Sequence, residues 1–396
     1  MNTACRVVAT LASALLAALL LAVPAGAETP APNWSGLDAR HYAGPIPAAG
    51  ALISTVPLDA ALSVSGAGQA YRILYATENQ HGRPAVSTAA VFVPHSPAPA
   101  GGWPVIAWAH GTVGLGDNCT PSALPRSTRD DEYLSHWLDQ GYVVVGTDYA
   151  GLGTPGLMSY LNSAAEAHSV IDSVKAVHRL PLPLSPKWAI VGQSQGGGAA
   201  VSSAWWAGRL TQGSGLDYRG VVATGTPANI ERVVREAGPD AAQREVPPAA
   251  ISYAAFILAA LREAHPELGV DTVLTARGRD LVDQAEVLCK RDLDQQVAGT
   301  TLNELFSAPM SSLPGVDETL GRFMGVPVEG YDRPIFLGAG LQDTDVPAVS
   351  SLTLNQQLVD HNQDVELHIY PTEDHSGTVI ASMPDSTRFL QRVLAD

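Results

Sequence analysis

Short apolar segments alternate with longer segments of helical spacing over most of the chain. The apolar segments predict buried strands at residues 104–109, 142–147, 188–191, 220–224, 334–337 and 365–370. The segments between them predict helices at residues 130–140, 162–178, 196–207 and 348–360, and a last helix at 378–393. This alternation is typical of an α/β fold in which helices cover both faces of a mostly parallel sheet.

Two β-rich segments, residues 70–77 and 85–93, precede this pattern and are separated by a turn at 78–84. They predict an antiparallel start to the sheet. Before them, residues 28–68 predict an extended arm, because their first half is rich in Pro, Ala and Gly and has little periodicity. The core is therefore predicted at residues 69–226 and 333–396.

One connection is too long for a usual crossover. About a hundred residues, 227–332, separate two predicted strands and predict a helical cap or lid inserted into the core. Residues 249–261 are strongly apolar and residues 274–289 are amphipathic. These faces are expected either to meet a substrate or only to pack on each other.

The N-terminus has the pattern of a secretory signal peptide, residues 1–27. Arg6 precedes an apolar run at residues 7–23, and a small-x-small site ends at Ala27. The alternative is a membrane anchor, but the run is short and no basic stop-transfer cluster follows it. We therefore expect cleavage after Ala27 and a secreted, extracellular protein.

If the chain is exported, its cysteines are expected to form a disulfide bond. Cys5 lies in the predicted signal peptide, which leaves Cys119 and Cys289 in a compartment where thiols tend to pair. One disulfide is the simplest reading, and two buried free thiols are the alternative, since sequence does not show their separation.

The balance of charge limits the possible partners. The formal net charge is −16 and no basic run is present, so nucleic acid would be repelled over most of the surface. Metal-ligand and phosphate-loop spacings do not occur either, so no cofactor is implied.

The strongest chemical signal is the run Gly192-Gln193-Ser194-Gln195-Gly196, which follows a predicted strand and precedes a predicted helix. This is the context of the G-x-S-x-G nucleophile elbow of the α/β-hydrolase fold. The turn is so sharp that strand and helix can approach only where side chains are lacking, and the helix N-terminus favours the negative charge of acyl transfer. The run predicts an α/β-hydrolase fold with Ser194 as the nucleophile.

A serine nucleophile needs a base, and the base needs an orienting acid, in the chain order serine, acid, histidine. Three histidines lie late enough in the chain. His361 falls at a predicted helix end and His368 inside a predicted strand, whereas His375 lies in a loop beyond the last strand. Because the crevice of an open α/β sheet forms at that edge, His375 is the predicted base.

The loop after the preceding strand, residues 338–347, offers two carboxylates for the acid. Asp343 is nearer the strand end and is the predicted acid. Asp345 stands just before Val346 and Pro347, where it could start or cap the next helix. Spacing alone leaves Asp345 as a rival.

The oxyanion of an acyl-transfer intermediate needs two backbone N–H donors. One is expected from Gln195, after the nucleophile, and the other from Thr112, in a loop after an earlier strand. His110 is predicted to support this loop rather than to catalyse. Asp148 ends another strand, and its carboxylate is predicted to pin the turn that follows through backbone N–H groups.

From residue 71 to the C-terminus the chain resembles the secretory lipase family of exported fungal and bacterial hydrolases. The resemblance rests on the Gln-flanked elbow and on the runs Tyr71-Arg72-Ile73-Leu74-Tyr75, His110-Gly111-Thr112-Val113-Gly114, Cys119-Thr120-Pro121-Ser122, Gly146-Thr147-Asp148-Tyr149-Ala150-Gly151-Leu152-Gly153 and Asp343-Thr344-Asp345-Val346-Pro347. It implies an acid three residues before the Val of the Val-Pro pair, which favours Asp343. It also implies a helical lid over an acyl pocket and a disulfide between Cys119 and Cys289. Met158-Ser159-Tyr160 departs from the expected His-Pro-Tyr, which affects the local loop shape and not the triad.

The resulting prediction is a secreted serine hydrolase that cleaves carboxylic esters, as lipases and esterases do, through an acyl-enzyme on Ser194. Its partners would be small-molecule or lipid ester substrates, with transient contact between the cap and a lipid interface. A peptidase or an acyltransferase on the same fold is the alternative. A non-catalytic binding protein is the least favoured, because all three triad residue types are present.

Overall fold

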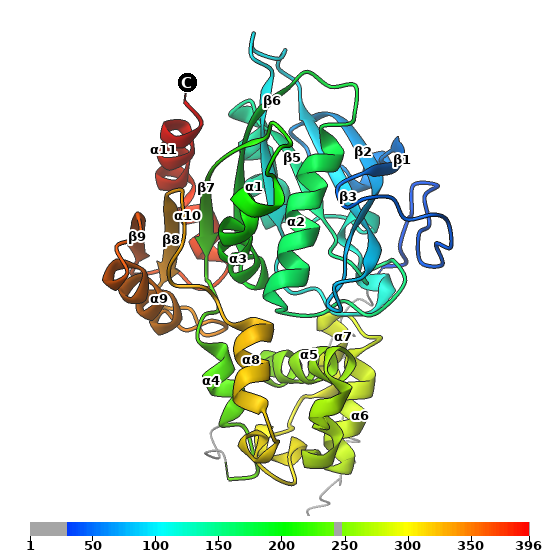
Figure 1. The fold of residues 1–396 in the computed structure, drawn as a ribbon, viewed down its shortest axis with the longest axis vertical. Coiled ribbons are helices and arrows are strands. Elements are labelled where there is room, and N and C mark those ends of the chain that lie inside the picture. The colour runs from blue at the N-terminus through cyan, green and yellow to red at the C-terminus, as the bar shows by residue number, and fades with distance from the viewer. Residues whose placement is uncertain (1–29, 241–247, 396) are drawn as a thin grey trace, which may run out of the picture.

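A nine-stranded sheet forms the centre of the computed structural model, which describes residues 30–240 and 248–395 (Figure 1). In chain order the strands are β1 (Leu52–Pro57), β2 (Ala67–Glu78), β3 (Pro84–Pro94), β4 (Trp103–Ala109), β5 (Val143–Thr147), β6 (Leu184–Gln193), β7 (Asp217–Thr224), β8 (Ile335–Gly340) and β9 (Val365–Tyr370). Across the sheet they stand in the order β1-β2-β3-β5-β4-β6-β7-β8-β9. The pairs β1–β2, β2–β3 and β3–β5 are antiparallel. The six strands β4 to β9 are parallel to one another. The carboxyl ends of six parallel strands therefore meet at one edge.

Helices cover both faces of this sheet. The helices of the core are α1 (Thr128–Asp139), α2 (Ser163–Val177), α3 (Gln195–Leu210), α9 (Val349–Asp360), α10 (Gly377–Ala381) and α11 (Met383–Leu394). Along β4, Val105 and Ala107 face the layer of α2 and α3, while Ile106 and Trp108 face the layer of α1 and α11. Both faces of the strand are buried, which explains its continuous apolar sequence.

The predicted α/β-hydrolase fold, with its mostly parallel sheet and inserted cap, is confirmed. Each of the eight predicted strands lies within or overlaps an observed one, and the antiparallel start is β2 and β3. The predicted last helix is two helices, α10 and α11, separated at Ser382. Pro384 lies in the first turn of α11 and has no N–H to continue the ladder of α10, which accounts for the break.

The segment predicted as an extended arm contributes to the sheet. Residues Leu52–Pro57 form the edge strand β1, paired with β2. Its sequence, LISTVP, does not alternate between apolar and polar residues, so periodicity does not predict a strand there. The arm also includes the first two residues of β2, and the rest of its described part contains one short 3-10 turn and buries Ala39, Leu62 and Val64.

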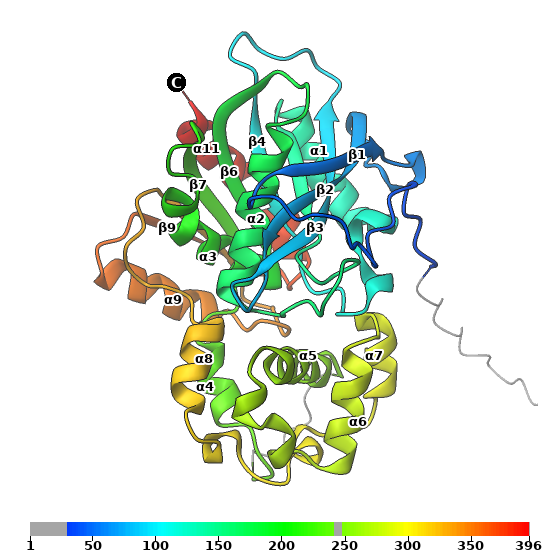
Figure 2. The same cartoon turned by 45° about the vertical axis from the view of Figure 1, so that its right-hand side comes forward.

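The inserted cap contains helices and no strand among its described residues. Its helices are α4 (Ile230–Arg235), α5 (Pro248–Ala264), α6 (Ala276–Ala285), α7 (Lys290–Gln296) and α8 (Val316–Met324), joined by short 3-10 turns. Figure 2 shows α5 end-on at the centre of the cap, with α6 and α7 on one side and α4 and α8 on the other. The buried apolar side chains of α5 make this helix the core of the cap, and α8 rests against α2 of the hydrolase core.

A disulfide bond between Cys119 and Cys289 joins the cap to the core. Cys119 lies in the loop after β4, and Cys289 is the residue before α7, with the two Cα atoms 5.3 Å apart. The bridge between Gly114 and Cys289 continues this attachment along the backbone.

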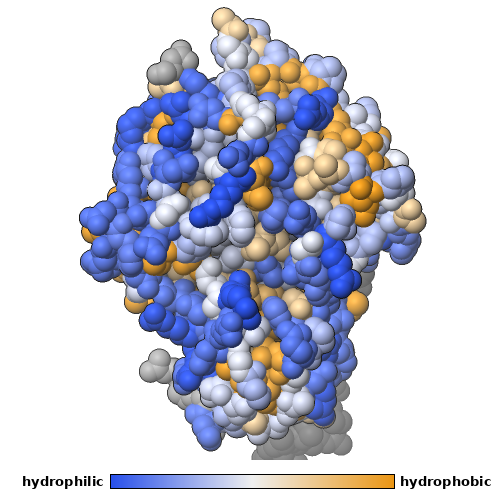
Figure 3. Space-filling model, in the orientation of Figure 1, coloured by the Kyte–Doolittle hydropathy of each residue, from blue (hydrophilic) through white to orange (hydrophobic). Residues whose placement is uncertain are grey.

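Hydrophobic residues lie in small, separate groups on the face drawn in Figure 3, between larger hydrophilic areas. Within residues 30–240 and 248–395, no helix combines the length and the apolar character that crossing a bilayer requires. The predicted signal peptide and its cleavage site after Ala27 lie outside the described residues.

Candidate active site

Ser194 stands in a strained turn between the end of β6 and the start of α3. Its backbone has φ 59° and ψ −127°, a conformation that residues other than glycine rarely adopt. A Cβ atom on Gly192 would lie 1.9 Å from the carbonyl oxygen of Gly196, and one on Gly196 would lie 1.9 Å from that of Ala109. The two glycines are therefore required for the close approach that holds Ser194 in this geometry.

The loops after β8 and β9 bring an acid and a histidine together. His375 Nδ1 lies 2.6 Å from Asp343 Oδ2, and both side chains are buried. The other oxygen of Asp343 accepts hydrogen bonds from the backbone N–H groups of Asp345 at 2.9 Å and Val346 at 2.8 Å. Asp343, rather than its rival Asp345, is thus the carboxylate that contacts His375.

The second nitrogen of His375 faces the elbow. His375 Nε2 lies 2.9 Å from the side-chain nitrogen of Gln193, the residue before Ser194. Since Nδ1–H is donated to Asp343, Nε2 carries the lone pair and Gln193 donates to it. Among the described residues, none forms a hydrogen bond with Ser194 Oγ, and a bond from this hydroxyl to His375 Nε2 would have to replace that of Gln193. Sequence reasoning missed this role, because position 193 in the elbow pattern is variable.

Two backbone N–H groups lie free beside the serine. No described group accepts a hydrogen bond from the N–H of Thr112, and that of Gln195 opens α3 without a helical partner. Gly111 brings the first of them close, because a Cβ atom there would lie 3.4 Å from Ser194 Cβ. The Thr112 hydroxyl is 2.6 Å from the Tyr160 hydroxyl. The structure therefore places both predicted oxyanion donors around Ser194.

A buried carboxyl stands behind the Gln195 donor. Glu166 of α2, 2% exposed, accepts hydrogen bonds from the side-chain amide of Gln195 at 2.7 Å and from the Leu161 N–H at 3.0 Å. Burial raises the pKa of Glu166 to about 8, although both hydrogen bonds lower it. The sequence did not indicate this group, since an acid in the first turn of a helix usually compensates the helix dipole.

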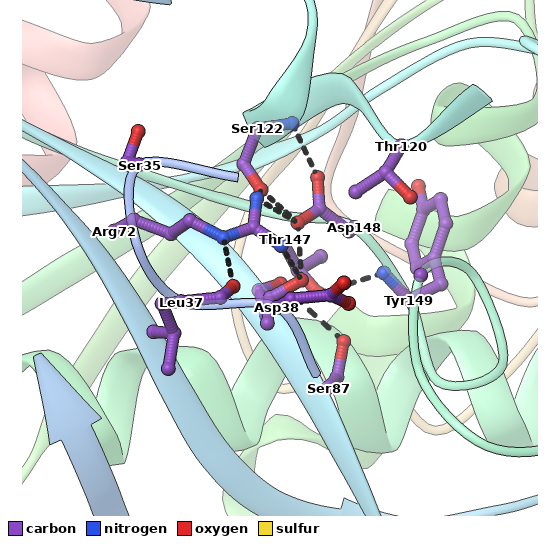
Figure 4. A network of polar contacts seen from close by, with 12 residues as sticks. Ser35, Leu37, Asp38, Arg72, Ser87, Thr120, Ser122, Thr147, Asp148 and Tyr149 are labelled. Atoms are coloured by element: carbon purple, nitrogen blue, oxygen red, sulfur yellow. Dashed lines mark hydrogen bonds and ion pairs between the residues drawn. The ribbon is translucent and has the colours of Figure 1, made fainter. Parts of the chain in front are cut away.

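His110 and Asp148 lie beneath the site. His110 Nδ1 bonds the Gly111 carbonyl at 2.7 Å, and burial lowers the pKa of the His110 ring, as expected of a supporting residue. The carboxylate of Asp148 does not bond its own turn. It accepts hydrogen bonds from the Ser122 N–H and the Thr88 hydroxyl and lies 3.9 Å from the Arg72 guanidinium (Figure 4). Asp148 thus ties the disulfide-bearing loop to the sheet.

Two cavities meet at Ser194. An apolar cavity of about 280 Å³ extends under the cap, and its lining includes Tyr160, Ile230, Ala254, Ile257, Leu258 and Phe306. A wider groove of about 1040 Å³ opens to the surface, and its lining includes Thr112, Arg126, Lys290, Asp294, Ala298 and His375. One side of the serine therefore offers an apolar chamber and the other a polar channel.

The donor atoms of Asp343, Asp345 and His375 lie within 4.8 Å of one another, a spacing that could hold a metal ion. Because His375 and Asp343 already share a hydrogen bond, a metal would have to break it. The arrangement suits proton transfer without such an ion.

The sheet, the cap and the geometry at the elbow make this chain an α/β-hydrolase. The model of the secretory lipase family matches residues 126–311, which confirms over that segment the resemblance predicted from residue 71 to the C-terminus. The model of the prolyl oligopeptidase family matches residues 309–395. No curated protein sequence matches the chain.

Solved structures share this architecture at low sequence identity. Candida antarctica lipase A in its closed state is 19% identical, with a TM-score of 0.69 over 88% of this chain and 82% of that one. The rice cell wall degrading esterase LipA from Xanthomonas oryzae is 20% identical, with a TM-score of 0.70 over 88% and 99%. A hydrolase of Legionella pneumophila, described as putative, is 20% identical, with a TM-score of 0.71 over 87% and 99%. At these identities the likeness supports the fold.

Proposed function

We propose that this protein is a secreted carboxylic ester hydrolase that acts through an acyl-enzyme on Ser194, with His375 as the base and Asp343 as its orienting acid. The observation that carries the proposal is the 2.6 Å contact between Asp343 and His375, whose other ring nitrogen, Nε2, faces the nucleophile elbow and is bonded there by Gln193. The match to the secretory lipase family supports the choice of ester chemistry.

In the acylation step, the ester carbonyl binds with its oxygen toward the N–H groups of Thr112 and Gln195. Binding displaces the Gln193 amide from His375 Nε2, which then takes the proton of Ser194 Oγ as that atom attacks the carbonyl carbon. Asp343 holds the imidazole in the required tautomer and stabilises the imidazolium that forms. The two N–H groups stabilise the oxyanion without reorganisation, because the backbone already fixes them.

Collapse of the intermediate completes the first half of the reaction. His375 gives its proton to the leaving alkoxide oxygen, and the alcohol departs through the polar groove. Water then enters by the same route, His375 removes its proton, and attack on the acyl-enzyme releases the acid and restores Ser194.

The two cavities suggest which part of the substrate goes where. The apolar cavity under the cap suits the acyl chain, because its lining is mostly aliphatic and aromatic. The polar groove suits the alcohol and water. Transient contact between the cap and a lipid interface remains part of the proposal.

A peptidase is the second candidate, since the prolyl oligopeptidase family model covers the segment that carries Asp343 and His375. The apolar cavity beside Ser194 favours an acyl chain over a peptide. Transfer of the acyl group to another alcohol would use the same site.

The predicted signal peptide and the disulfide support an extracellular location. Residues 227–332 are proposed to act as the lid.

The test is hydrolysis of p-nitrophenyl esters from acetate to palmitate by the mature protein, beside Ser194→Ala. We expect the substitution to lower kcat by about 10⁶-fold. Ser203→Ala, a buried serine on the far part of α3, is the matched control and should retain activity. Wild-type inactivity on every ester, with cleavage of peptide substrates, would replace the ester proposal by the peptidase.

A further inference from the structure

The two oxyanion donors are supported from one short segment of the chain. Tyr160, in the loop before α2, bonds the Thr112 side chain at 2.6 Å, and Glu166, in the first turns of α2, bonds the Gln195 side chain at 2.7 Å. Asn162 is the N-cap residue of α2, and its side chain accepts a hydrogen bond from the Ala165 N–H. This bond fixes the start of the helix between Tyr160 and Glu166. The segment thus contacts both halves of the oxyanion hole from behind.

The hydrogen bonds of Glu166 are compatible with a neutral acid. Its Oε1 atom accepts both hydrogen bonds, from Gln195 and from Leu161, as the carbonyl oxygen of a protonated carboxyl would. Its Oε2 atom receives none from the described residues. The small cavity beside it, about 10 Å³, is also lined by Ser202, whose buried Oγ has no hydrogen-bond partner in the described part of the chain. This space holds about one water molecule, far too little to hydrate a carboxylate.

The described surroundings of Glu166 offer no compensating positive charge. The titratable groups that face Glu166 from the elements packed on α2 are the hydroxyls of Tyr149 and Tyr160, each with a pKa raised by burial and by Glu166 itself. Among the described residues of α3, α4 and α8, no cation forms an ion pair with Glu166. A negative charge here would thus be neither paired nor solvated.

We propose that Glu166 is a positioning residue that holds the Gln195 half of the oxyanion hole as a neutral carboxylic acid, with Tyr160 holding the Thr112 half. The inference rests on the proposed function, since it concerns the same site. Loss of the proton would place a full negative charge one side chain away from the developing oxyanion. Repulsion would then raise the barrier of both acyl-transfer steps.

We expect the kcat of the wild type to fall only in part as the pH rises through the pKa of Glu166, and then to reach a plateau. With the pKa of Glu166 at about 8, kcat of the wild type should fall about tenfold between about pH 7 and pH 9 and then level off. Glu166→Gln keeps the carbonyl acceptor and cannot ionise. Its kcat at neutral pH should stay within about twofold of the wild type, without the alkaline fall.

The test is the pH profile of kcat and KM for p-nitrophenyl butyrate with wild type, Glu166→Gln, Glu166→Ala and the control Glu132→Gln, an exposed acid of α1. Glu166→Ala should lower kcat about tenfold at neutral pH with little change in KM. Glu132→Gln should reproduce the wild-type profile. An alkaline fall that persists in Glu166→Gln, or a wild-type kcat in Glu166→Ala, overturns the proposal.

A second measurement covers the case in which the variants do not fold. The infrared difference spectrum of the wild type across the same pH range should lose a protonated carboxylic acid band with a midpoint near the pKa of Glu166, about 8. A spectrum without this band contradicts the neutral acid whatever the activity. Failure of the ester proposal would instead appear as activity that survives Ser194→Ala.

Discussion

The core and the cap meet at Ser194 but contribute different kinds of contact to the site. Around the serine, the core fixes atoms through close contacts and hydrogen bonds, as Gly192, Gly196, Asp343 and Thr112 show. The cap contributes a mostly aliphatic wall to the apolar cavity, and none of its described residues forms a hydrogen bond with Ser194, His375 or Asp343. Chemistry is thus determined by the ends of the strands, and the shape of the substrate by the cap. Substitutions in the two regions should therefore have different kinetic signatures.

The largest expected effect concerns the core. Asp343→Asn should lower kcat/KM by about 10⁴-fold, because the amide favours the wrong histidine tautomer. Asp345→Asn is the matched control and should change kcat/KM by less than about threefold, since Asp345 accepts a hydrogen bond from Tyr253 of the cap and forms none with His375. The measurement is hydrolysis of p-nitrophenyl butyrate. A larger loss in Asp345→Asn would mean that the acid was assigned to the wrong residue.

The next largest effect concerns the disulfide bond between cap and core and its contribution to the free energy of unfolding. Replacing Cys119 and Cys289 together by serine should lower the free energy of unfolding by about 2–4 kcal/mol, since the bond closes a loop with a sequence separation of 170 residues. Denaturant unfolding measures it, and kcat of the folded fraction should change little. An unchanged unfolding free energy would show that cap and core hold together without the bond.

The cap should alter selectivity more than rate. Ala254→Leu extends into the apolar cavity and should lower kcat/KM for octanoate esters about tenfold while leaving acetate within about twofold. Ala298→Leu, in the polar groove, is the control and should leave the acyl-length profile unchanged. Equal losses on both esters in Ala254→Leu would argue against this cavity as the acyl site.

The smallest expected effect lies where the two regions touch. Tyr160 lines the apolar cavity and also bonds Thr112. Tyr160→Phe should lower kcat about fivefold through the lost hydrogen bond, with KM nearly unchanged. The acyl-length profile should be that of the wild type, because the ring remains. A change in that profile alone would assign Tyr160 to the pocket and not to the oxyanion hole.

Much of the core could be predicted because its signals are local. Buried parallel strands are short apolar runs, and the elbow needs glycine at two fixed positions, so β4 to β9 and Ser194 follow from the sequence. His375 follows from its place after a strand end, whereas Asp343 was favoured over Asp345 by the family resemblance. The structure brings Asp343 and His375 together, and their catalytic roles remain predictions.

The rest depends on contacts between distant segments. Glu166 and Tyr160 carry no local mark of their role, since their partners lie 29 and 48 residues away. The segment of β1 is a strand because it pairs with β2, and its own sequence does not show this. Within the cap, periodicity indicated helices at 249–261 and 274–289 but not which face would line a cavity.

The bond between Cys119 and Cys289 also has a consequence for the timing of assembly. Its second cysteine leaves the ribosome only after β1 to β7 have been synthesised, yet β8 and β9 are still to come. Oxidation before those two strands dock would tether a cap to an incomplete sheet whose edge, at β7, is open. An open strand edge can pair with another chain, so the order in which this bond and the last two strands form affects whether the sheet is completed or aggregates.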